Sequence, residues 1–164
     1  MCTGRGYTAQ MRLDARNFHD PDPGPLRDHS GLHPDIVERL VGCDIFPQWL
    51  EDARDNISIA IQRARDTTAR LVTILVYCNA GRHRSVAAAE VIKHSVETVE
   101  GLRTLPTVHL SARFNRGHCA CRACSPGQHG FHDARRVLAL QQGATVCATV
   151  TQGRLPDELP CVIL

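Results

Sequence analysis

The stretch from Leu71 to Glu90 (LVTILVYCNAGRHRSVAAAE) constrains the fold of this chain most strongly. Its first part, Leu71–Tyr77, is apolar or β-branched without a break, which predicts a strand buried on both faces. From Ser85 onward the sequence is rich in alanine, which predicts a helix. A short polar loop that contains a glycine joins the two. The stretch therefore predicts a buried strand, a tight loop and a helix in direct succession.

The loop between these two elements has the features of an anion-binding site. The first N–H groups of a helix have no partner within the helix, and the helix dipole favours negative charge beside them. Arg84 adds a planar guanidinium suited to phosphate, and Ser85 adds a hydroxyl at the start of the helix. We therefore expect the loop to bind a phosphate or another oxyanion.

Cys78, the first residue of the loop, allows two interpretations. Surrounding N–H dipoles and Arg84 would lower the pKa of the thiol and make it a reactive thiolate. Alternatively, Cys78 is a small, partly apolar residue that ends a strand, as free cysteines often do. The residues alone leave both interpretations open.

Hydrophobic periodicity predicts the remaining elements. Strands are expected at Gln10–Arg16, Leu105–Leu110 and Ala144–Val150, and helices at Pro34–Val41, from Pro47 towards Arg70, from Ser85 towards Gly101, and at Phe131–Gln142. A helix separates the strand at 71–77 from the one at 105–110, so these two strands are expected to be parallel. The prediction is a single α/β domain over residues 10–150, with a flexible N-terminus at 1–9 and a C-terminal tail at 151–164.

Composition narrows the class of protein. A chain of 164 residues can form one domain with a real core, and no apolar run reaches the length of a membrane span. The first 16 residues contain no apolar segment of the kind that directs export, so we expect a cytoplasmic protein with no membrane partner. The formal net charge of +2 is too small to imply nucleic-acid binding by itself, although all basic residues except Lys93 are arginines.

Residues 113–130 form a Cys/His-rich insertion with almost no apolar content. A loop of this length without structure is uncommon in a compact domain unless something such as a metal orders it. The Cys-x2-Cys spacing within it is typical of zinc sites. The expected ligands of a structural zinc ion are Cys119, Cys121, Cys124 and one of His129 and His132. The alternative is a set of reduced surface thiols or a disulfide.

The residues after the first and third predicted strands are candidates for the rest of the site. Ligands of open α/β sheets bind beyond the C-terminal ends of the strands. Arg16 and His19 would then reach the same edge as Cys78 and hold the organic part of a phosphorylated ligand. The alternative is a solvated loop in which Asp14 and Arg16 form an ion pair. His109, at the end of another predicted strand, is expected to point to the same edge.

The loop resembles two families. Residues Cys78–Ser85 match the Cys-x2-Gly-x2-Arg-Ser loop of dual-specificity phosphatases. This resemblance implies Cys78 as nucleophile, Arg84 as phosphate clamp and an upstream general acid, for which Asp44 is a candidate. Tyr77 stands where that family usually has histidine, which is a departure from the pattern.

The chain resembles the C-terminal domain of the RNase adapter protein RapZ over a much longer stretch. The residues that carry the resemblance, in that family's order, are Asp14-Ala15-Arg16, Asp20-Pro21, Leu26-Arg27, Ser30-Gly31-Leu32, Gly81-Arg82-His83-Arg84-Ser85-Val86 and Val108-His109. They correspond to its Asp-x-Arg, Asn/Asp-Pro, Leu-Arg, Thr-Gly-Leu-Asp, Gly-x-His-Arg-Ser-Val and strand-ending histidine. His33 replaces the aspartate of the fourth motif.

The RapZ resemblance implies a domain that senses an amino-sugar phosphate and, in some members, binds a small RNA and recruits a ribonuclease. The expected ligand-binding residues are Arg16, His19, Cys78, Asn79, Ala80, Gly81, Arg82, His83, Arg84, Ser85 and His109. No G-x4-G-K-[ST] motif occurs, so no nucleotide cofactor is expected. The combined expectation is a small, mostly parallel Rossmann-like sheet flanked by helices, which acts as a sensor or adapter. The alternative is a cysteine-dependent phosphatase, and the sequence leaves the oligomeric state open.

Overall fold

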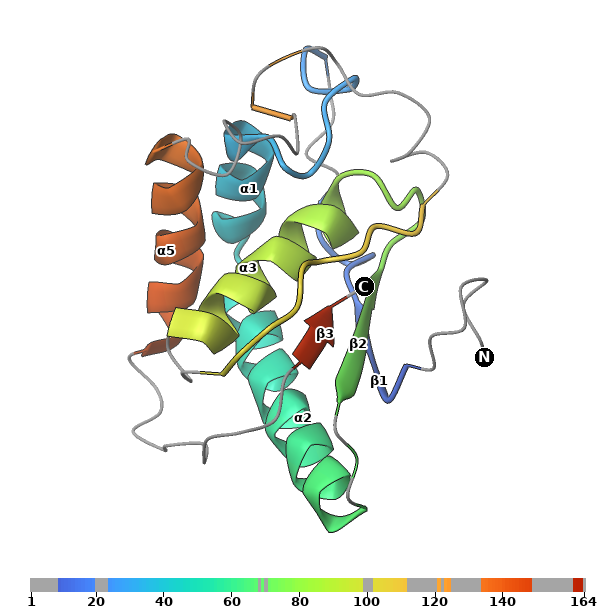
Figure 1. Cartoon of the computed structure of the whole chain (residues 1–164). Coiled ribbons are helices and arrows are strands. Elements are labelled where there is room, and N and C mark those ends of the chain that lie inside the picture. Colours follow the sequence, from blue (N-terminus) through green and yellow to red (C-terminus); the bar gives the residue numbers. More distant parts are fainter. Residues whose placement is uncertain are drawn as a thin grey trace.

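The central element of the fold is strand β2 (Val72–Tyr77), which follows the predicted buried strand closely. The computed structural model describes residues 9–19, 24–67, 69, 71–98, 102–111, 121, 123–124, 134–148 and 161–163. Within them β2 lies between β1 (Met11–Asp14) and β3 (Cys161–Ile163) in a three-stranded sheet of order β1-β2-β3 (Figure 1). Both pairs are parallel, so the predicted parallel α/β sheet is confirmed.

Helices pack against this sheet and against one another (Figure 1). Their bounds are Pro34–Val41 for α1, Phe46–Asp66 for α2, Arg84–Thr98 for α3 and Ala134–Ala148 for α5. α1 begins and ends where the sequence predicted, because Pro34 suits the first turn of a helix and His33 caps it by accepting the Asp35 N–H. No helix in the described parts of the chain is long and apolar enough to cross a membrane.

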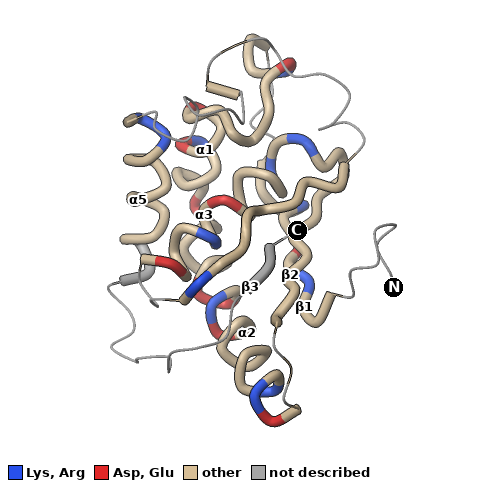
Figure 2. The backbone as a smooth tube through the Cα atoms, viewed as in Figure 1, with Lys and Arg blue, Asp and Glu red and all other residues tan. Residues whose placement is uncertain are grey.

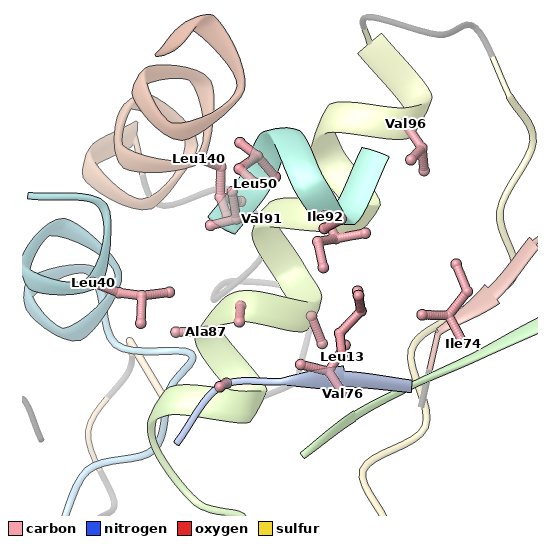
Figure 3. Close-up of a cluster of buried hydrophobic side chains, with 14 of the residues drawn as sticks. Leu13, Leu40, Leu50, Ile74, Val76, Ala87, Val91, Ile92, Val96 and Leu140 are labelled. Atoms are coloured by element: carbon pink, nitrogen blue, oxygen red, sulfur yellow. The ribbon is translucent and has the colours of Figure 1, made fainter. Parts of the chain in front are cut away.

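The hydrophobic core fixes α3 over the sheet. Leu13 of β1 and Val76 of β2 are buried in one cluster with Ala87 and Ile92 of α3 (Figure 3). Leu40, Leu50 and Leu140 add side chains from α1, α2 and α5 to the same cluster. Burying one such aliphatic side chain contributes roughly 1.5–3 kcal/mol. The start of α3 is therefore held firmly beside the C-terminal end of β2.

The predicted strand at Leu105–Leu110 is wrong. Residues 105–110 form no strand, and only Thr104 makes an isolated bridge in the described segment 102–111. Pro106 has no N–H to give to a ladder, and β3 takes the edge of β2 at Val72, Thr73 and Ile74. The segment remains useful for the site, because it brings His109 and Ser111 to the loop after β2.

The predicted strand at Ala144–Val150 is also wrong for the residues that the structure describes, since α5 continues to Ala148. The predicted helix ended at Gln142, but the next residue, Gly143, is a contact point between helices. A Cβ there would lie 2.8 Å from Val91 Cγ1 and 3.0 Å from Val41 Cγ2. Close packing, rather than a turn, explains this glycine. The third strand comes instead from residues 161–163, within the segment predicted as a tail.

Candidate functional site

The loop after β2 forms one wall of a small pocket of about 230 Å³. Its lining includes Cys78, Gly81, Ser85, His109, Leu110 and Ser111. Sites that enclose a drug-sized ligand usually measure roughly 300–1,000 Å³, so this pocket suits a smaller group. The structure thus brings His109 to the predicted loop residues, although it lies about thirty residues after Cys78 in the sequence.

Gly81 gives the loop its shape. Its φ angle of +63° lies in the left-handed region, which strongly favours glycine. A Cβ on Gly81 would also lie 2.7 Å from Ser111 Cβ. The Ser111 hydroxyl donates to the Ala80 carbonyl at 3.2 Å and fastens the opposite wall to the loop. The loop therefore needs both the backbone freedom and the small size of glycine at this position.

Cys78 lies partly buried at the base of the pocket. Gly81 N–H donates to Cys78 Sγ at 3.2 Å, and the thiol donates to Ser85 Oγ at 3.3 Å. Burial alone would raise the pKa of Cys78. Hydrogen bonds that the thiolate would accept from the Ser85 side chain and from the backbone of Ser85, Gly81 and Ala80 lower it overall. The same donors that stabilise a thiolate could also hold the oxygen of a bound anion.

Arg84, the first residue of α3, is buried and points towards the segment after β1. Its Nη1 donates to the carbonyl oxygens of Arg16 at 2.8 Å and Phe18 at 2.9 Å. These contacts hold the chain after β1 against the start of α3. A phosphate contact by Arg84 would have to use other N–H groups of its guanidinium.

Arg82 and His83 join the loop to residues 28–29. Arg82 Nε donates to the His29 carbonyl at 2.9 Å, and Arg82 Nη2 donates to the Asp28 carbonyl. His83 Nε2 lies 2.9 Å from the same His29 carbonyl, and because a carbonyl only accepts, this nitrogen carries the proton. Of the predicted ligand residues, Arg82 and His83 thus have a defined role in holding two segments together.

Gly31 makes this contact close. Its N–H donates to the Arg82 carbonyl at 2.8 Å. A Cβ on Gly31 would lie 2.5 Å from Ala87 N and 2.7 Å from Val86 Cβ, and closer still to the His83 carbonyl. The Ser-Gly-Leu motif in the sequence therefore marks a place where one backbone rests directly on another.

His109 is anchored by a buried carboxylate that sequence reasoning missed. Glu90 Oε1 lies 3.5 Å from His109 Nε2, and Glu90 Oε2 accepts from Arg136 Nη2 at 2.9 Å. Burial would raise the pKa of Glu90, but the His109 hydrogen bond and the Arg136 charge lower it overall. A glutamate among the apolar residues of α3 was the available signal, because a buried carboxylate requires partners.

Arg16 and His19, which follow β1, do not line the pocket of Cys78. Arg16 pairs with Asp14 at 2.6 Å and lies over the Tyr77 ring, 5.4 Å from its centroid, so the ion pair of the alternative interpretation is present. The Arg16 hydrogen bond lowers the pKa of Asp14 to about 2. His19 and Asp44 line a separate hollow, apart from the pocket of Cys78. Asn79 is exposed in the loop.

Two of the predicted metal ligands lie beside histidines from another part of the chain. Cys121 Sγ and Cys124 Sγ lie 3.3 Å and 3.5 Å from His29 Nδ1. His33, four residues further along the chain, belongs to the same cluster. These side chains could hold a metal ion. The other predicted ligands, Cys119, His129 and His132, lie outside the described residues.

Basic and acidic residues alternate along much of the described chain. Figure 2 shows basic and acidic residues interspersed along the described chain, and α2 carries both signs. An anion at the pocket would therefore be held by local donors rather than by a continuous run of basic residues.

Comparison with known proteins gives relatives of greater length. Three of them carry the name nucleotide-binding protein: one from Mycolicibacterium smegmatis is 32% identical over 111 residues, one from Rhizorhabdus wittichii 33% over 85 residues, and one from Anaeromyxobacter sp. 31% over 90 residues. These matches cover 63%, 51% and 54% of this chain but only 38%, 27% and 31% of the relatives. The chain thus spans about a third of their length. No solved structure matches.

A family model agrees with the resemblance seen in the motifs. The model described as the RapZ C-terminal domain matches residues 3–111. This range contains β1, β2, α3 and every lining residue named for the pocket, whereas Cys121 and Cys124 lie beyond it. Because the match covers more than half of the chain, the protein belongs to the RapZ C-terminal domain family.

Proposed function

We propose that this domain binds a phosphorylated small molecule and places its phosphoryl group at the start of α3. The observation that carries the proposal is the pocket, in which Gly81, Ser85 and His109 surround a space of about 230 Å³ at the N-terminus of a 15-residue helix. Backbone N–H groups of the first helical turn and the helix dipole favour an anion there. The domain would serve as a sensor or adapter of the RapZ type.

The side chains around the pocket support this assignment. Ser85 supplies a hydroxyl at the first turn, and His109 supplies a ring whose orientation is fixed by the buried Glu90. A hydroxyl, an imidazole and backbone N–H groups thus surround one small space. Together they suit the several acceptor oxygens of a phosphate. The apolar part of the lining, which includes Leu110, would contact the organic part of the ligand.

The ligand class proposed first is an amino-sugar phosphate, since the chain belongs to the RapZ C-terminal domain family. The names of the relatives add nucleotides as a second class to test. The sequence contains no G-x4-G-K-[ST] motif, so a nucleotide would have to bind here without a P-loop.

A ligand screen by thermal unfolding tests the proposal. Glucosamine-6-phosphate should raise the melting temperature, with a stabilisation of about 2.7 kcal/mol at a hundredfold excess over Kd. Glucosamine without phosphate should give no shift. Inorganic phosphate measures the contribution of the anion alone, and ATP tests whether a nucleotide also binds. An equal shift with glucosamine would mean that the phosphate is not recognised.

Two variants locate the ligand. Ser85→Ala should reduce the shift, because it removes a hydroxyl that lines the pocket. Asp44→Asn is the matched control, because Asp44 lines the other hollow. The proposal fails if Ser85→Ala keeps the full shift while Asp44→Asn loses it.

The adapter role implies a macromolecular partner, and we propose RNA or a ribonuclease as that partner on the basis of family membership. Interspersed charges predict contact with few phosphates at a time, and therefore RNA binding that is weak and has a shallow salt dependence (Figure 2). A mobility-shift titration with a structured RNA at low and physiological salt would measure it, and the absence of any complex at low salt would exclude direct RNA binding.

A cysteine-dependent phosphatase is the second candidate, and the lowered pKa of Cys78 favours it. Two observations weigh against it: Arg84 donates to backbone carbonyls, and Asp44 lines a different hollow. Hydrolysis of p-nitrophenyl phosphate by the wild type, with loss of turnover in Cys78→Ser, would establish a phosphatase. A folded wild type without turnover leaves binding as the function.

A further inference from the structure

The strongest feature that the pocket does not explain is a cluster of two cysteines and two histidines. His29 and His33 come from the segment before α1 and its cap, whereas Cys121 and Cys124 come from the Cys/His-rich insertion. Ligand atoms of His29, His33 and Cys121 all lie within 4.8 Å of one another, and Cys124 Sγ is 3.5 Å from His29 Nδ1. Segments about ninety residues apart in the numbering thus place three ligand atoms close to one another, and the sulfur of Cys124 beside one of them.

We propose that His29, His33, Cys121 and Cys124 bind one zinc ion. Both pairs have the spacing of structural zinc sites, Cys-x2-Cys for the thiols and His-x3-His for the imidazoles. This ligand set shares Cys121 and Cys124 with the sequence prediction but replaces Cys119 and the later histidines. The sequence prediction searched within the insertion, whereas the fold brings in a histidine pair from the other end of the domain.

The separations between His29 Nδ1 and the two sulfurs fit a tetrahedral zinc ion. Zinc bonds of roughly 2.3 Å to sulfur and 2.0 Å to nitrogen, at the tetrahedral angle, separate the two ligand atoms by roughly 3.6 Å. The observed separations from His29 Nδ1 are 3.3 Å to Cys121 Sγ and 3.5 Å to Cys124 Sγ. One hydrogen can bond the ring nitrogen to only one of the two sulfurs, whereas a shared cation contacts all three atoms.

The surroundings of the thiols are those of a zinc knuckle. Cys124 N–H donates to the Cys121 carbonyl at 3.2 Å and closes the turn between the two cysteines. Ser30 N–H donates to Cys124 Sγ at 3.4 Å, which favours a thiolate. Cys124 is fully buried. His33 Nδ1 accepts the Asp35 N–H. Zinc on the other ring nitrogen would move the proton to Nδ1, which would exchange this bond for a contact with the Asp35 carboxylate oxygen 4.0 Å away.

The metal site would stabilise the loop after β2, which lines the pocket. The His29 carbonyl accepts from both Arg82 and His83 of the loop after β2. A zinc ion that fixes the His29 ring would therefore also fix the backbone on which this loop rests. The inference is independent of the proposed function, since metal binding can be measured without any phosphorylated ligand.

Metal analysis of the full chain, purified without a histidine tag, tests the site. We expect about one zinc per chain in the wild type and in Cys43→Ser and Cys119→Ser, and a loss of zinc in Cys124→Ser and His29→Gln. Cys43 is the matched control, because it is a free cysteine of the described chain outside the cluster. Retention of zinc in His29→Gln with loss in Cys119→Ser would overturn this ligand set.

Cobalt substitution provides a test that needs no variant. The wild type reconstituted with Co²⁺ should show the visible bands of a tetrahedral ion and a sulfur-to-cobalt charge-transfer intensity for two thiolates. An intensity for three thiolates would overturn the proposal in favour of a site that includes Cys119. A folded wild type that binds neither Co²⁺ nor Zn²⁺ would also overturn it and leave only hydrogen bonds between thiols and imidazole.

Discussion

The pocket around Cys78 and the cluster around Cys124 use sulfur in opposite ways. Each sulfur accepts a backbone N–H, from Gly81 in the pocket and from Ser30 in the cluster. Cys78 is otherwise surrounded by further N–H and hydroxyl donors, whereas Cys124 lies with Cys121 beside His29. Donors alone favour a bound anion, and thiols with imidazoles favour a soft cation. The neighbours of a cysteine, more than the cysteine, decide which ligand it suits.

The two regions also differ in their relation to the family. The pocket lies within the matched range 3–111, whereas Cys121 and Cys124 lie outside it. They meet at residues 28–31, where the backbone of one region rests on the loop of the other. The following predictions test whether the regions are separate sites with a shared support.

The largest effect is expected from Gly31→Ala, which acts where the regions meet. The new Cβ would lie 2.5 Å from Ala87 N, and the backbone at the start of α3 cannot move aside because the core holds it. We expect a loss of about 3 kcal/mol or more in the free energy of unfolding, together with impaired zinc and ligand binding. Urea unfolding followed by circular dichroism measures the loss.

Gly42→Ala is the control for this prediction. Gly42 has a negative φ angle, and the nearest atom to an added Cβ is Glu38 O at 3.2 Å. Its substitution should change stability by about 0.5 kcal/mol or less. Equal effects of the two substitutions would mean that the close contact at Gly31 does not join the regions.

The next effect is expected from Arg84→Ala, which acts on the pocket side alone. The change removes two hydrogen bonds from a buried guanidinium to the carbonyls of Arg16 and Phe18. A loss of about 2–3 kcal/mol is expected, because hydrogen bonds to charged groups are strong and the carbonyls lose their donor. Zinc content should remain at the wild-type level. Loss of zinc in a folded Arg84→Ala variant would contradict the separation of the regions.

Arg82→Ala is the matched comparison on the side of the cluster. Arg82 is half-buried and donates to the carbonyls of Asp28 and His29. The expected loss is smaller, about 1 kcal/mol, because water can replace part of the contact. The variant should weaken the link between the regions without removing either site.

The sequence predicted the pocket better than the cluster, for a physical reason. Strand β2, the loop and α3 are contiguous, so an apolar run, a glycine and an alanine-rich segment determine them locally. The cluster joins residues far apart in the chain, and only the fold brings His29 and His33 to the insertion. Their His-x3-His spacing was the signal available, and it has meaning only beside a Cys-x2-Cys.

The errors in the fold have the same origin. The segment at 105–110 looked like a strand locally, but β2 pairs with β3 from the far end of the chain. Residues 144–148 looked like a strand after Gly143, but packing of Gly143 against α1 and α3 keeps the helix continuous. Partners that are distant in sequence decided both cases, and a single sequence does not reveal them.

Thiol modification should distinguish the two regions with a smaller effect. Iodoacetamide should modify Cys78 in the zinc-loaded protein, while Cys121 and Cys124 should react only after chelation. The reaction of Cys78 should begin at lower pH than for an ordinary thiol, because its pKa is lowered by hydrogen bonds that outweigh the effect of burial. Ser85→Ala should raise that pH, since it removes one of those hydrogen bonds. Mass spectrometry of the modified peptides measures each site. Protection of Cys78 by zinc that a chelator removes would contradict the separation of the two regions.

The smallest effect is expected from Asp14→Asn, which tests whether the segment after β1 belongs to the pocket. The pKa of Asp14 is about 2, below its ordinary 3.8, so its pairing with Arg16 stabilises the fold above pH 3.8 and is lost as the pH falls towards 2. Because the pair is largely exposed, Asp14→Asn should cost less than about 1 kcal/mol at pH 7 and nothing below pH 2. If Arg16 only pairs with Asp14, the ligand-induced thermal shift should stay unchanged in the variant. If Arg16 also contacts the phosphorylated ligand, its release from Asp14 should alter that shift, and the pocket would then extend to the loop after β1.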